Sequence, residues 1–324
     1  MLVSPGVSIV IPTRNRSGLL RLTLHAALWQ RGVDVEVIVV DDGSTDDTLQ
    51  VIRGLGSERI RVARHEKPRG VSAARNRGIA EARGDWIAFL DDDDLWAPDK
   101  LASQLRAMGS DARWSYAGTV KIDGQGRIIG GAPPPPPNAV LARLRRWNLV
   151  PGGCSGVVVA RRLLRSTGGF DPSLVNLADW DLWIRLGQHG PPEYVPEPMV
   201  GYRLHPGQAS LDLDLILREA EIVARKHRTR LDVGALHHYL AQKALLGGNR
   251  RRALKHFAVA AMRGEAIPVV TDLGRRFGAR LMRPVPPAAS LVRWRAAAMP
   301  WLSALRSMTA SAGPPSPPRA ENLY

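Results

Sequence analysis

The residues with the clearest chemical meaning are four consecutive aspartates, Asp91 to Asp94, which follow the apolar stretch Trp86–Leu90. At an effective dielectric of about 20 and a spacing of about 4 Å, two such carboxylates repel each other by roughly 4 kcal/mol. A divalent cation would offset this repulsion, and Mg²⁺ and Mn²⁺ prefer oxygen ligands. The run therefore predicts a metal site that handles phosphate. The alternative is an exposed acidic turn that caps the next helix.

Two further polar groups follow apolar stretches in the same way. Pro12–Arg16 comes after Val7–Ile11, and Asp41–Asp46 comes after Val35–Val40. A carboxylate beside such a turn can accept a hydrogen bond from the imide N–H of a pyrimidine or from a ribose hydroxyl. The alternative for the second group is a solvated loop whose Ser or Thr caps a helix.

The first half of the chain alternates short β-branched stretches with helical patterns, and this predicts an α/β fold with a mostly parallel sheet flanked by helices. In such a sheet, ligands bind outside the carboxyl ends of the strands, where the three polar groups lie. The expected strands are Val7–Ile11, Val35–Val40, Ile60–Ala63 and Trp86–Leu90, and the expected helices are Ser17–Gln30, Asp46–Leu55 and Ser72–Ala82.

Composition excludes several classes of protein. With 324 residues, of which 44% are hydrophobic and 23% charged, the chain can bury a full core and is not a disordered protein. Its apolar stretches are too short to cross a bilayer and its start does not resemble a signal peptide, so we expect a cytoplasmic protein. The single cysteine, Cys154, excludes internal disulfides and is expected to be a small packed residue. Glycine-rich phosphate-binding motifs are absent, which argues against a P-loop NTPase or a Rossmann dehydrogenase.

The net charge of +15 is concentrated in the last third of the chain. Residues 211–324 hold 19 basic and 8 acidic residues and read as successive helices, so we predict a boundary near residue 210. The expected parts are a first domain over 1–210, a basic helical module over 211–312, and a Pro-rich tail with a tag remnant over 313–324.

Within this module, Leu236–Ala261 predicts a helix, a Gly-Gly-Asn turn and a second helix. Arginines and tryptophans intermix over residues 265–320, as in basic amphipathic helices at a membrane interface. The alternative is a helical bundle that packs on the catalytic domain and exposes an arginine face. Five prolines, Pro133–Pro137, predict a stiff spacer between the sheet and the helix that follows.

Six segments in order resemble the family 2 glycosyltransferases, which have the GT-A fold. The segments are Val7–Arg16, Val39–Asp46, Gly70–Gly78, Phe89–Asp94, Ala178–Arg185 and Tyr202–Ser210. They cover about the first 210 residues, and the remainder shows no such match. An acidic residue often precedes the family's catalytic aspartate, whereas this chain has Ala178 at that position.

The resemblance implies a catalytic domain over 1–210, in which 1–95 bind the nucleotide sugar and 96–210 bind the acceptor. It also assigns roles to single residues. It implies that Asp179 is the catalytic base and that Asp93 is a metal ligand, with Asp91 and His205 as further ligands of Mn²⁺ or Mg²⁺. Within the aspartate run, the functional set remains open between the first three and the last three residues. Trp180 is a candidate acceptor contact, although core packing is its alternative. The implied nucleotide-binding residues are Pro12, Thr13, Arg14, Asp41, Asp42, Arg75 and Asp92.

We therefore expect an inverting glycosyltransferase that moves a sugar from a nucleoside-diphosphate sugar, with UDP favoured, to a hydroxyl of a glycan or lipid-linked acceptor. The expected reaction is a metal-assisted single displacement with an aspartate base. We expect no nucleic-acid partner, and the inner face of the cytoplasmic membrane is a candidate location. The alternatives are a sugar nucleotidyltransferase and a non-enzymatic Arg-rich protein that binds membrane or nucleic acid.

Overall fold

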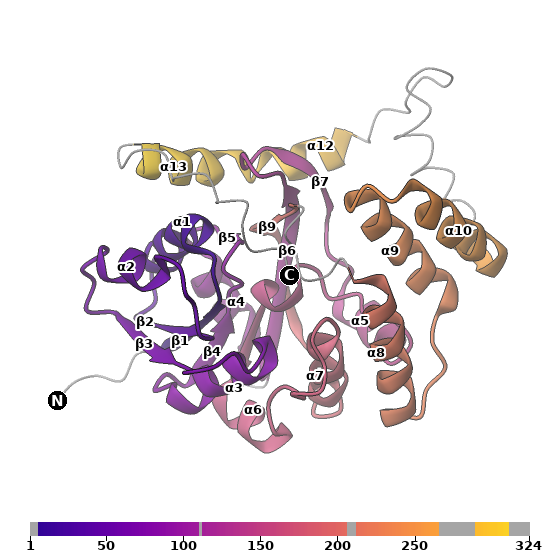
Figure 1. The fold of residues 1–324 in the computed structure, drawn as a ribbon, viewed down its shortest axis with the longest axis horizontal. Helices are drawn as coiled ribbons and strands as arrows, with labels where there is room; N and C mark the ends of the chain where they lie inside the picture. Colours follow the sequence, from indigo (N-terminus) through magenta and orange to yellow (C-terminus); the bar gives the residue numbers. More distant parts are fainter. Residues whose placement is uncertain (1–5, 110–111, 206–211, 266–288, 311–324) are drawn as a thin grey trace.

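The computed structural model describes residues 6–109, 112–205, 212–265 and 289–310, and a single curled sheet runs through its centre (Figure 1). The sheet has nine strands in the order β3-β2-β1-β4-β8-β6-β9-β5, with β7 paired to β6. Four strands of the first half are parallel, as predicted: β1 (Val7–Thr13), β2 (Val35–Asp41), β3 (Ile60–Arg64) and β4 (Trp86–Phe89).

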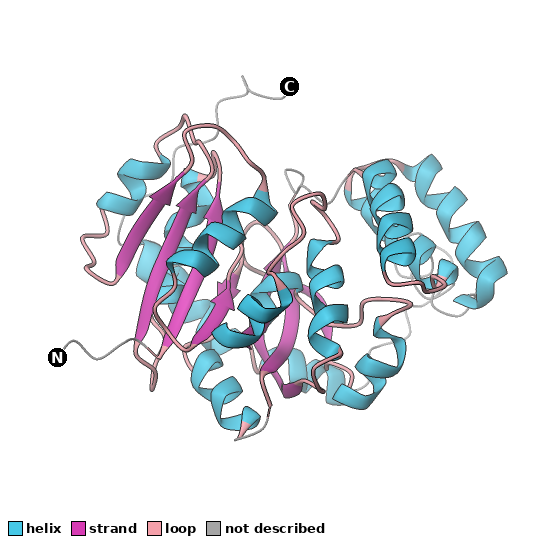
Figure 2. Ribbon diagram, turned by 90° about the horizontal axis from the view of Figure 1, so that it is seen from below, coloured by secondary structure: helices cyan, strands magenta, loops and turns pink. Residues whose placement is uncertain are grey.

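The strands of the second half add antiparallel pairs to this mostly parallel sheet. β8 runs antiparallel to β4 and to β6, whereas β6 and β9 are parallel to each other. Figure 2 shows this curved sheet between helices on both sides. The remaining strands are β5 (Leu95–Trp96), β6 (Trp114–Ile122), β7 (Ile128–Ala132), β8 (Val157–Ala160) and β9 (Glu193–Arg203).

The register of the parallel strands brings their carboxyl ends to one edge. Thr13 at the end of β1 lies opposite Asp41 at the end of β2, and Val10 lies opposite Phe89. Because both faces of these strands are covered, every residue of β1 and β2 is buried, which explains their continuous apolar sequence. The three polar groups that follow the strands are therefore neighbours in space.

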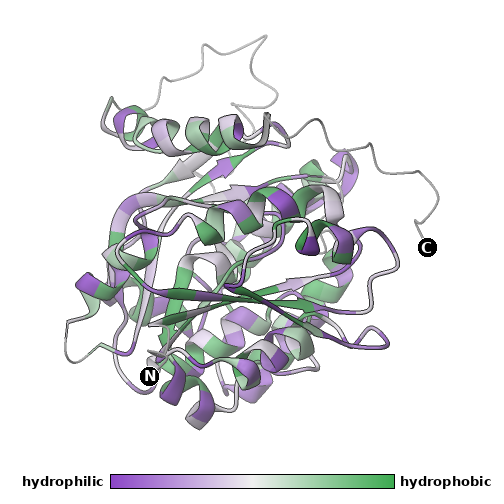
Figure 3. Ribbon diagram, turned by 90° about the vertical axis from the view of Figure 1, so that its left-hand side faces the viewer, coloured by the Kyte–Doolittle hydropathy of each residue, from purple (hydrophilic) through white to green (hydrophobic). Residues whose placement is uncertain are grey.

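Two apolar cores lie on the two faces of the sheet. Alternate residues of β1 divide between them, with Ile9 and Ile11 in one core and Val10 in the other. The second of these cores includes α3, where a side chain on Gly78 would lie 2.2 Å from a methyl group of Val10, so only glycine allows this helix to pack so closely. Figure 3 shows the largely hydrophobic strands between the helices.

The helices of the first 205 residues lie on both faces. α1, α2 and α4 share the core of Ile9, whereas α3, α5, α6 and α7 share the core of Val10. These helices are α1 (Ser17–Leu28), α2 (Thr48–Arg53), α3 (Val71–Glu81), α4 (Lys100–Met108), α5 (Pro137–Leu144), α6 (Arg161–Thr167) and α7 (Ala178–Gly187), and a short 3-10 helix, η1, spans Gly153–Gly156.

The helices that follow residue 210 separate into two groups (Figure 1). α8 (Leu213–Lys226), α9 (Val233–Leu246) and α10 (Arg250–Ala260), which continues into η3 (Ala261–Glu265), share the core of Val10. α12 (Ala289–Ala296) and α13 (Met299–Ala310) pack on the opposite face, where Leu302 and Leu305 are fully buried. The predicted helix–turn–helix within Leu236–Ala261 is confirmed.

The tryptophans of α12 and α13 face the sheet. The indole Nε1 of Trp294 donates to the carbonyl of Pro196 at 2.7 Å, and that of Trp301 donates to the carbonyl of Pro198 at 3.2 Å. These helices therefore pack on the sheet. This confirms the packing that was expected as one of the two alternatives for them. Arg275, Arg276, Arg280 and Arg283 and the Pro-rich tail lie outside the described residues, and the boundaries at 95 and 210 stay predictions.

No helix among the described residues is both long and apolar enough to cross a membrane.

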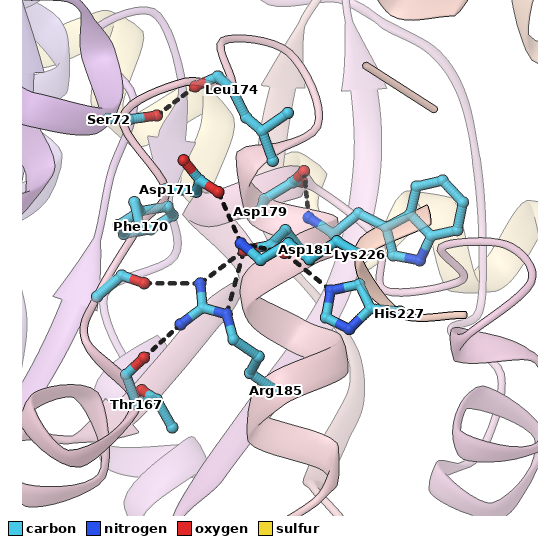
Figure 4. Close-up of polar contacts among 12 residues, drawn as sticks. Ser72, Thr167, Phe170, Asp171, Leu174, Asp179, Asp181, Arg185, Lys226 and His227 are labelled. Carbon is cyan, nitrogen blue, oxygen red and sulfur yellow. Dashed lines mark hydrogen bonds and ion pairs between the residues drawn. The ribbon is translucent and has the colours of Figure 1, made fainter. Parts of the chain in front are cut away.

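A buried carboxylate joins α7 to the end of α8. Asp181 is fully buried and accepts from Arg185 at 2.7 Å, His227 at 2.8 Å and Lys226 at 2.9 Å (Figure 4). Although burial opposes it, the hydrogen bonds from His227 and Lys226 and the Arg185 guanidinium hold the pKa of Asp181 well below its ordinary value. The pair of Asp181 and Arg185 confirms the i,i+4 contact expected from helical spacing.

Replacing Asp181 by Asn should lower the free energy of unfolding by about 3 kcal/mol at pH 7, because Arg185 and Lys226 lose a buried carboxylate and His227 loses a hydrogen-bond partner. Since the folded pKa is depressed, the contribution of Asp181 is present above pH 4 or so and is lost as the pH falls further. Urea unfolding at several pH values measures this difference. Asp214→Asn, in an exposed pair with Arg252, is the control and should leave the stability close to that of the wild type. Equal stability of the two variants would contradict the prediction.

Candidate active site

The carboxyl ends of three parallel strands form one hydrogen-bonded group. The Thr13 hydroxyl donates to Asp92 Oδ2 at 2.7 Å, and the backbone N–H of Asp42 donates to the carbonyl of Thr13 at 2.9 Å. The N–H of Leu90 donates to the carbonyl of Val10 at 3.0 Å. The structure therefore brings together Thr13, Asp42 and Asp92, which lie far apart in the sequence.

Asp42 is held by the loop that leads into α3. Its Oδ1 accepts from the N–H of Arg69, its Oδ2 accepts from the N–H of Gly70, both at 2.8 Å, and His65 Nδ1 lies 2.7 Å from Oδ1. Although burial opposes it, these hydrogen bonds hold the pKa of Asp42 below its ordinary value. The carboxylate is thus ionised and fixed in place. His65 and Arg69–Gly70 carry no motif that the sequence analysis could have recognised.

Asp41 does not face the open end of the sheet. It is fully buried, accepts from the N–H of Ser44 at 2.8 Å, and lies 3.2 Å from Arg64 Nε. Direct nucleotide binding by Asp41 is therefore a prediction that the structure corrects: this carboxylate shapes the turn after β2. Pro12 is buried within β1, whereas Arg14 is exposed just beyond its end.

Asp91 is paired with Arg75 of α3. Arg75 Nη2 lies 2.6 Å from Asp91 Oδ1, and the guanidinium stacks 5.3 Å from the centre of the Phe170 ring. Arg75 is buried, and its Nε is without a hydrogen-bond partner within the described part of the chain. The charge of Asp179 also acts on this guanidinium, so Arg75 lies between two predicted site carboxylates.

Asp93 faces two basic side chains. Its Oδ2 lies 2.6 Å from Arg16 Nη1 and 2.9 Å from His205 Nε2. Although burial opposes it, the His205 hydrogen bond and the Arg16 charge hold the pKa of Asp93 below its ordinary value. Asp92 differs, because burial raises its pKa to about 7 even with Arg16 at 3.5 Å.

Asp94 accepts hydrogen bonds inside the fold. It is fully buried, accepts from the Ser155 hydroxyl at 2.7 Å and accepts from the N–H of Arg203 at 2.9 Å. These bonds join the aspartate run to η1 and to the end of β9. Asp91, Asp92 and Asp93 are therefore the members of the run that remain for ligands.

The residues present fit a divalent cation at Asp93 and His205. The two side chains converge from the segments that follow different strands, and they offer the oxygen and nitrogen donors that Mn²⁺ accepts. Across the residues that the structure describes, however, no three His, Cys, Asp or Glu side chains gather as a metal cage. The predicted trio with Asp91 is therefore not assembled, and Asp91 is paired with Arg75 instead. Oxygen atoms of a substrate and of water would complete the coordination.

Asp179 lies in the first turn of α7. Its Oδ1 accepts from the N–H of Trp180 at 2.6 Å, and a side chain on Gly153 would lie 3.7 Å from Oδ2. Burial raises the pKa of Asp179 to about 6, and the Trp180 N–H and Arg75 oppose the rise. A carboxylate with this pKa is suited to accept a proton near neutral pH.

Trp180 is part of the core, and its assignment as an acceptor contact is wrong. Its side chain is fully buried and its ring lies 5.8 Å from that of Trp147. Cys154 is also buried, and burial raises the pKa of its thiol well above the ordinary value, which agrees with a packed residue.

The position of α7 depends on a glutamate from α8. Glu219 is buried and accepts from the N–H groups of Val175, Asn176 and Leu177, at 2.7, 2.8 and 2.8 Å. These three residues lead directly into the helix that carries Asp179. Sequence analysis missed this contact because the two segments lie more than 40 residues apart and Glu219 sits in an ordinary helical pattern.

Comparisons with known proteins agree with this geometry. The model of the family described as Glycosyl transferase family 2 matches residues 8–167. The chain is 29% identical over 186 residues to the UDP-Glc:alpha-D-GlcNAc-diphosphoundecaprenol beta-1,3-glucosyltransferase WfaP of Escherichia coli, with 57% of this chain and 71% of WfaP covered. The alignments cover 36%, 89% and 71% of the lengths of three relatives, the last of which is WfaP.

Two solved structures share the fold. The structure of S. aureus TarS residues 1–349 with UDP-GlcNAc has a TM-score of 0.58 at 16% identity and covers 94% of this chain and 92% of TarS. The mannosyltransferase PcManGT from Pyrobaculum calidifontis, in complex with GDP-Man and Mn²⁺, has a TM-score of 0.51 at 18% identity and covers 95% and 88%.

The mixed sheet with acidic strand ends has the GT-A fold. Residues 8–167 match glycosyl transferase family 2, and the chain is an enzyme with a glycosyltransferase domain. The alternatives of a sugar nucleotidyltransferase and of a non-enzymatic binding protein are therefore wrong.

Replacing Glu219 by Ala should lower the free energy of unfolding by about 3 kcal/mol, because three N–H groups lose a buried, charged acceptor. Urea denaturation measures the change. Glu221→Ala, on the exposed side of the same helix, is the matched control and should stay within about 0.5 kcal/mol of the wild type. If Glu219→Ala were as stable as the control, Glu219 would not hold the segment before α7.

Proposed function

We propose that this enzyme transfers a sugar with inversion from a nucleoside-diphosphate sugar, with UDP favoured, to a hydroxyl of a glycan or lipid-linked acceptor. The observation that carries the proposal is the ion-paired group at one edge of the sheet. Arg75 is paired with Asp91 and senses the charge of Asp179, while Asp92 and Asp93 follow directly in the chain. A base and a phosphate-handling centre thus belong to one site.

Asp179 is the proposed base. Its raised pKa allows it to take the proton of an acceptor hydroxyl and still be ionised at pH 7. Gly153, which has φ +54, presents no side chain toward Oδ2, and this leaves room for a hydroxyl at about 2.6–3.2 Å. The acceptor oxygen then attacks the anomeric carbon as the bond to the diphosphate breaks, so a covalent sugar–enzyme intermediate is not required.

Asp42 and Thr13 are proposed to contact the nucleotide base, with Pro12 and Arg14 shaping and flanking the turn. Two backbone N–H groups fix Asp42, and this holds its carboxylate ready to accept a hydrogen bond from an imide N–H. Asp92 is proposed to face the ribose and the donor sugar, in the position that the Thr13 hydroxyl sets.

Asp93 and His205 are proposed to hold Mn²⁺ or Mg²⁺. A cation bound there would neutralise the negative charge that develops on the departing diphosphate. The Mn²⁺ in the PcManGT complex supports this assignment, and so does the convergence of two suitable donors in this chain. Arg16 contacts the carboxylates of Asp92 and Asp93, and we propose that it turns toward the phosphates when the cation is present.

The proposed donor and acceptor classes draw on the relatives. WfaP is named for UDP-Glc as donor and a diphosphoundecaprenol-linked sugar as acceptor, and TarS binds UDP-GlcNAc. These names favour a UDP-sugar and a lipid-linked glycan here, and they suggest a role in cell-envelope polysaccharide synthesis. The proposed location is the cytoplasm, with peripheral attachment to the membrane that holds such acceptors.

The outer surface of α12 and α13 supports this attachment. Val292, Met299 and Met308 are 50%, 45% and 38% exposed, and Arg293 is exposed beside them. Apolar side chains next to a cation suit the interface of an anionic bilayer. The tryptophans do not contribute, because they pack inward.

Incubation with a panel of UDP-, GDP- and dTDP-sugars plus Mn²⁺ and an acceptor glycan should release free nucleoside diphosphate rather than pyrophosphate. Asp179→Asn and Asp93→Ala should each lower kcat by about a hundredfold or more, because they remove the base and the metal ligand. Since Asp179 acts in its ionised form, kcat/KM of the wild type should fall as the pH drops below about 6. Asp214→Asn is the control and should keep full activity. Unchanged turnover in both site variants would show that the roles are wrongly assigned.

Sedimentation with vesicles of anionic phospholipid tests the location. A Val292→Glu, Met299→Glu double variant should bind these vesicles at least tenfold more weakly than the wild type, because it places two carboxylates on the proposed contact surface. Leu254→Glu, at an exposed position of α10, is the control and should bind like the wild type. Equal binding by all three proteins would reject this surface as the membrane contact.

A further inference from the structure

The turn between α8 and α9 is rich in basic residues. Residues 225–232 hold four lysines or arginines and one aspartate, and residues 143–147 at the end of α5 add three more arginines. Hydrogen bonds join the two segments: Arg145 Nη2 donates to the carbonyl of His227 at 2.7 Å, and the N–H of Asp232 donates to the carbonyl of Arg146 at 2.9 Å. Basic residues from two distant parts of the chain therefore gather in one place.

Part of this charge is used within the protein. Arg143 pairs with Asp232, and Lys226 lies 2.9 Å from the buried Asp181. Four exposed arginines that follow the ends of α5 and α8 form no ion pair within the described part of the chain, and we call them the arginine surface: Arg145, Arg146, Arg228 and Arg230. Because these like charges repel one another, a bound anion would relieve the repulsion.

Arg228 occupies a backbone position that favours glycine. It lies in the left-handed region just after α8, with φ +47, and the N–H of Thr229 donates to the carbonyl of Ala224 at 3.0 Å, as in helix ends that use glycine there. Among the described residues, the other non-glycine residue with positive φ is Asn15, and asparagine adopts this region more readily than arginine. The chain thus accepts backbone strain to keep a long basic side chain at this point, which points to a function for that side chain.

The arginine surface lies next to the helix that carries the proposed base. His227, in the turn between α8 and α9, lies 2.8 Å from Asp181 of α7 through its Nε2. Trp180 Nε1 of the same helix donates to the carbonyl of Leu144, the last residue of α5, at 2.5 Å. Figure 4 shows His227 beside the first turn of α7, where Asp179 also lies. α7 therefore contacts both segments that form the surface.

A short segment leads from this surface to the proposed base. Gly153 follows Arg146 by seven residues, and a side chain on Gly153 would lie 3.7 Å from Asp179 Oδ2. Seven residues span at most about 25 Å, a distance that a short oligosaccharide covers. A glycan whose hydroxyl lies at Asp179 can therefore extend to the arginines.

The chemistry of the surface suits a hydrophilic anion better than a membrane. None of the large apolar side chains that are exposed in the described structure lies in residues 143–147 or 225–232. Such side chains occur instead on α12 and α13, which Figure 1 shows apart from α7 and α8. A guanidinium binds a carboxylate or a phosphate through two parallel hydrogen bonds, and it needs no apolar surroundings for this.

We propose that the arginine surface binds negatively charged groups of the acceptor, so that the enzyme selects an anionic glycan. The inference rests on the proposed function. The sugar that receives the new bond lies at Asp179, and charged sugars further along the acceptor contact the arginines. The charged groups are carboxylates or phosphates, since a guanidinium recognises both.

An Arg146→Gln, Arg230→Gln double variant tests the inference. The matched control is Arg21→Gln, Arg53→Gln, which removes two exposed arginines from α1 and α2. Fluorescence anisotropy measures binding of labelled oligogalacturonate, oligo(glycerol phosphate) and a neutral oligoglucan. The double variant should bind at least one anionic probe about tenfold or more weakly than the wild type, whereas the control should bind like the wild type. A loss for the first probe alone identifies a carboxylate as the ligand, and a loss for the second alone identifies a phosphate.

Arg228→Gly separates binding from folding. Because glycine suits the left-handed position better, this variant should unfold at a urea concentration equal to or higher than that of the wild type. It should nevertheless bind the same anionic probe about threefold or more weakly, because one of four charges is lost. Wild-type affinity in Arg228→Gly would contradict the inference.

Steady-state kinetics distinguish this inference from the proposed function. The Arg146→Gln, Arg230→Gln variant should raise KM for an anionic acceptor glycan about tenfold, with KM unchanged for the UDP-sugar and for a neutral form of the same acceptor. The inference is overturned if the wild type binds neutral and anionic probes equally, or if the double variant loses affinity only for anionic vesicles or an oligonucleotide. If the proposed function were wrong, the wild type would release no UDP from a UDP-sugar, whereas its binding of anionic glycans would persist.

Discussion

The structure depends on balancing negative charge at the carboxyl edge of a buried parallel sheet. Asp91, Asp92 and Asp93 lie where three strands end, and their mutual repulsion is offset by Arg75, Arg16 and His205. Each partner comes from a different element, so the balance exists only when the helices and strands are correctly packed. Burial gives the carboxylates different properties, since the pKa of Asp92 is raised to about 7 while that of Asp93 is lowered. One run of identical residues thereby provides distinct chemical groups.

The helices after residue 210 belong to this arrangement as much as the sheet does. Glu219 caps the segment that leads to Asp179, and Lys226 and His227 hold Asp181 in the same helix. α13 closes the opposite face, where Leu302 and Leu305 complete a core begun by β1. The basic residues of the last third therefore have more than one role. Lys226 and His227 hold the helix that carries Asp179, and others, such as Arg293, face outward. Overall charge alone could not distinguish these uses.

Much of the fold follows from local pattern. The continuous apolar stretches of β1 and β2 and the helical spacing of Leu20 and Leu24 predict the βαβ opening, because strands buried on both faces and amphipathic helices leave recognisable periods. The antiparallel pairing of β8 with β4 and β6 escaped prediction. A short strand such as Val157–Ala160 has the same sequence pattern in either direction. Trp180 and Asp41 were misassigned for a related reason: their residue types suit a binding site, and only packing shows that both are fully buried.

The sequence by itself determined the class of chemistry, because Thr13, Asp42 and the aspartate run follow apolar strands whose ends must meet at one edge. Tertiary structure alone decided which partner each carboxylate has. Asp94 turns inward to Ser155, and Asp93 meets His205, which follows a strand more than 100 residues later. Contacts of this kind depend on long-range packing and burial, which set pKa values and partners and leave no periodic signal in the chain.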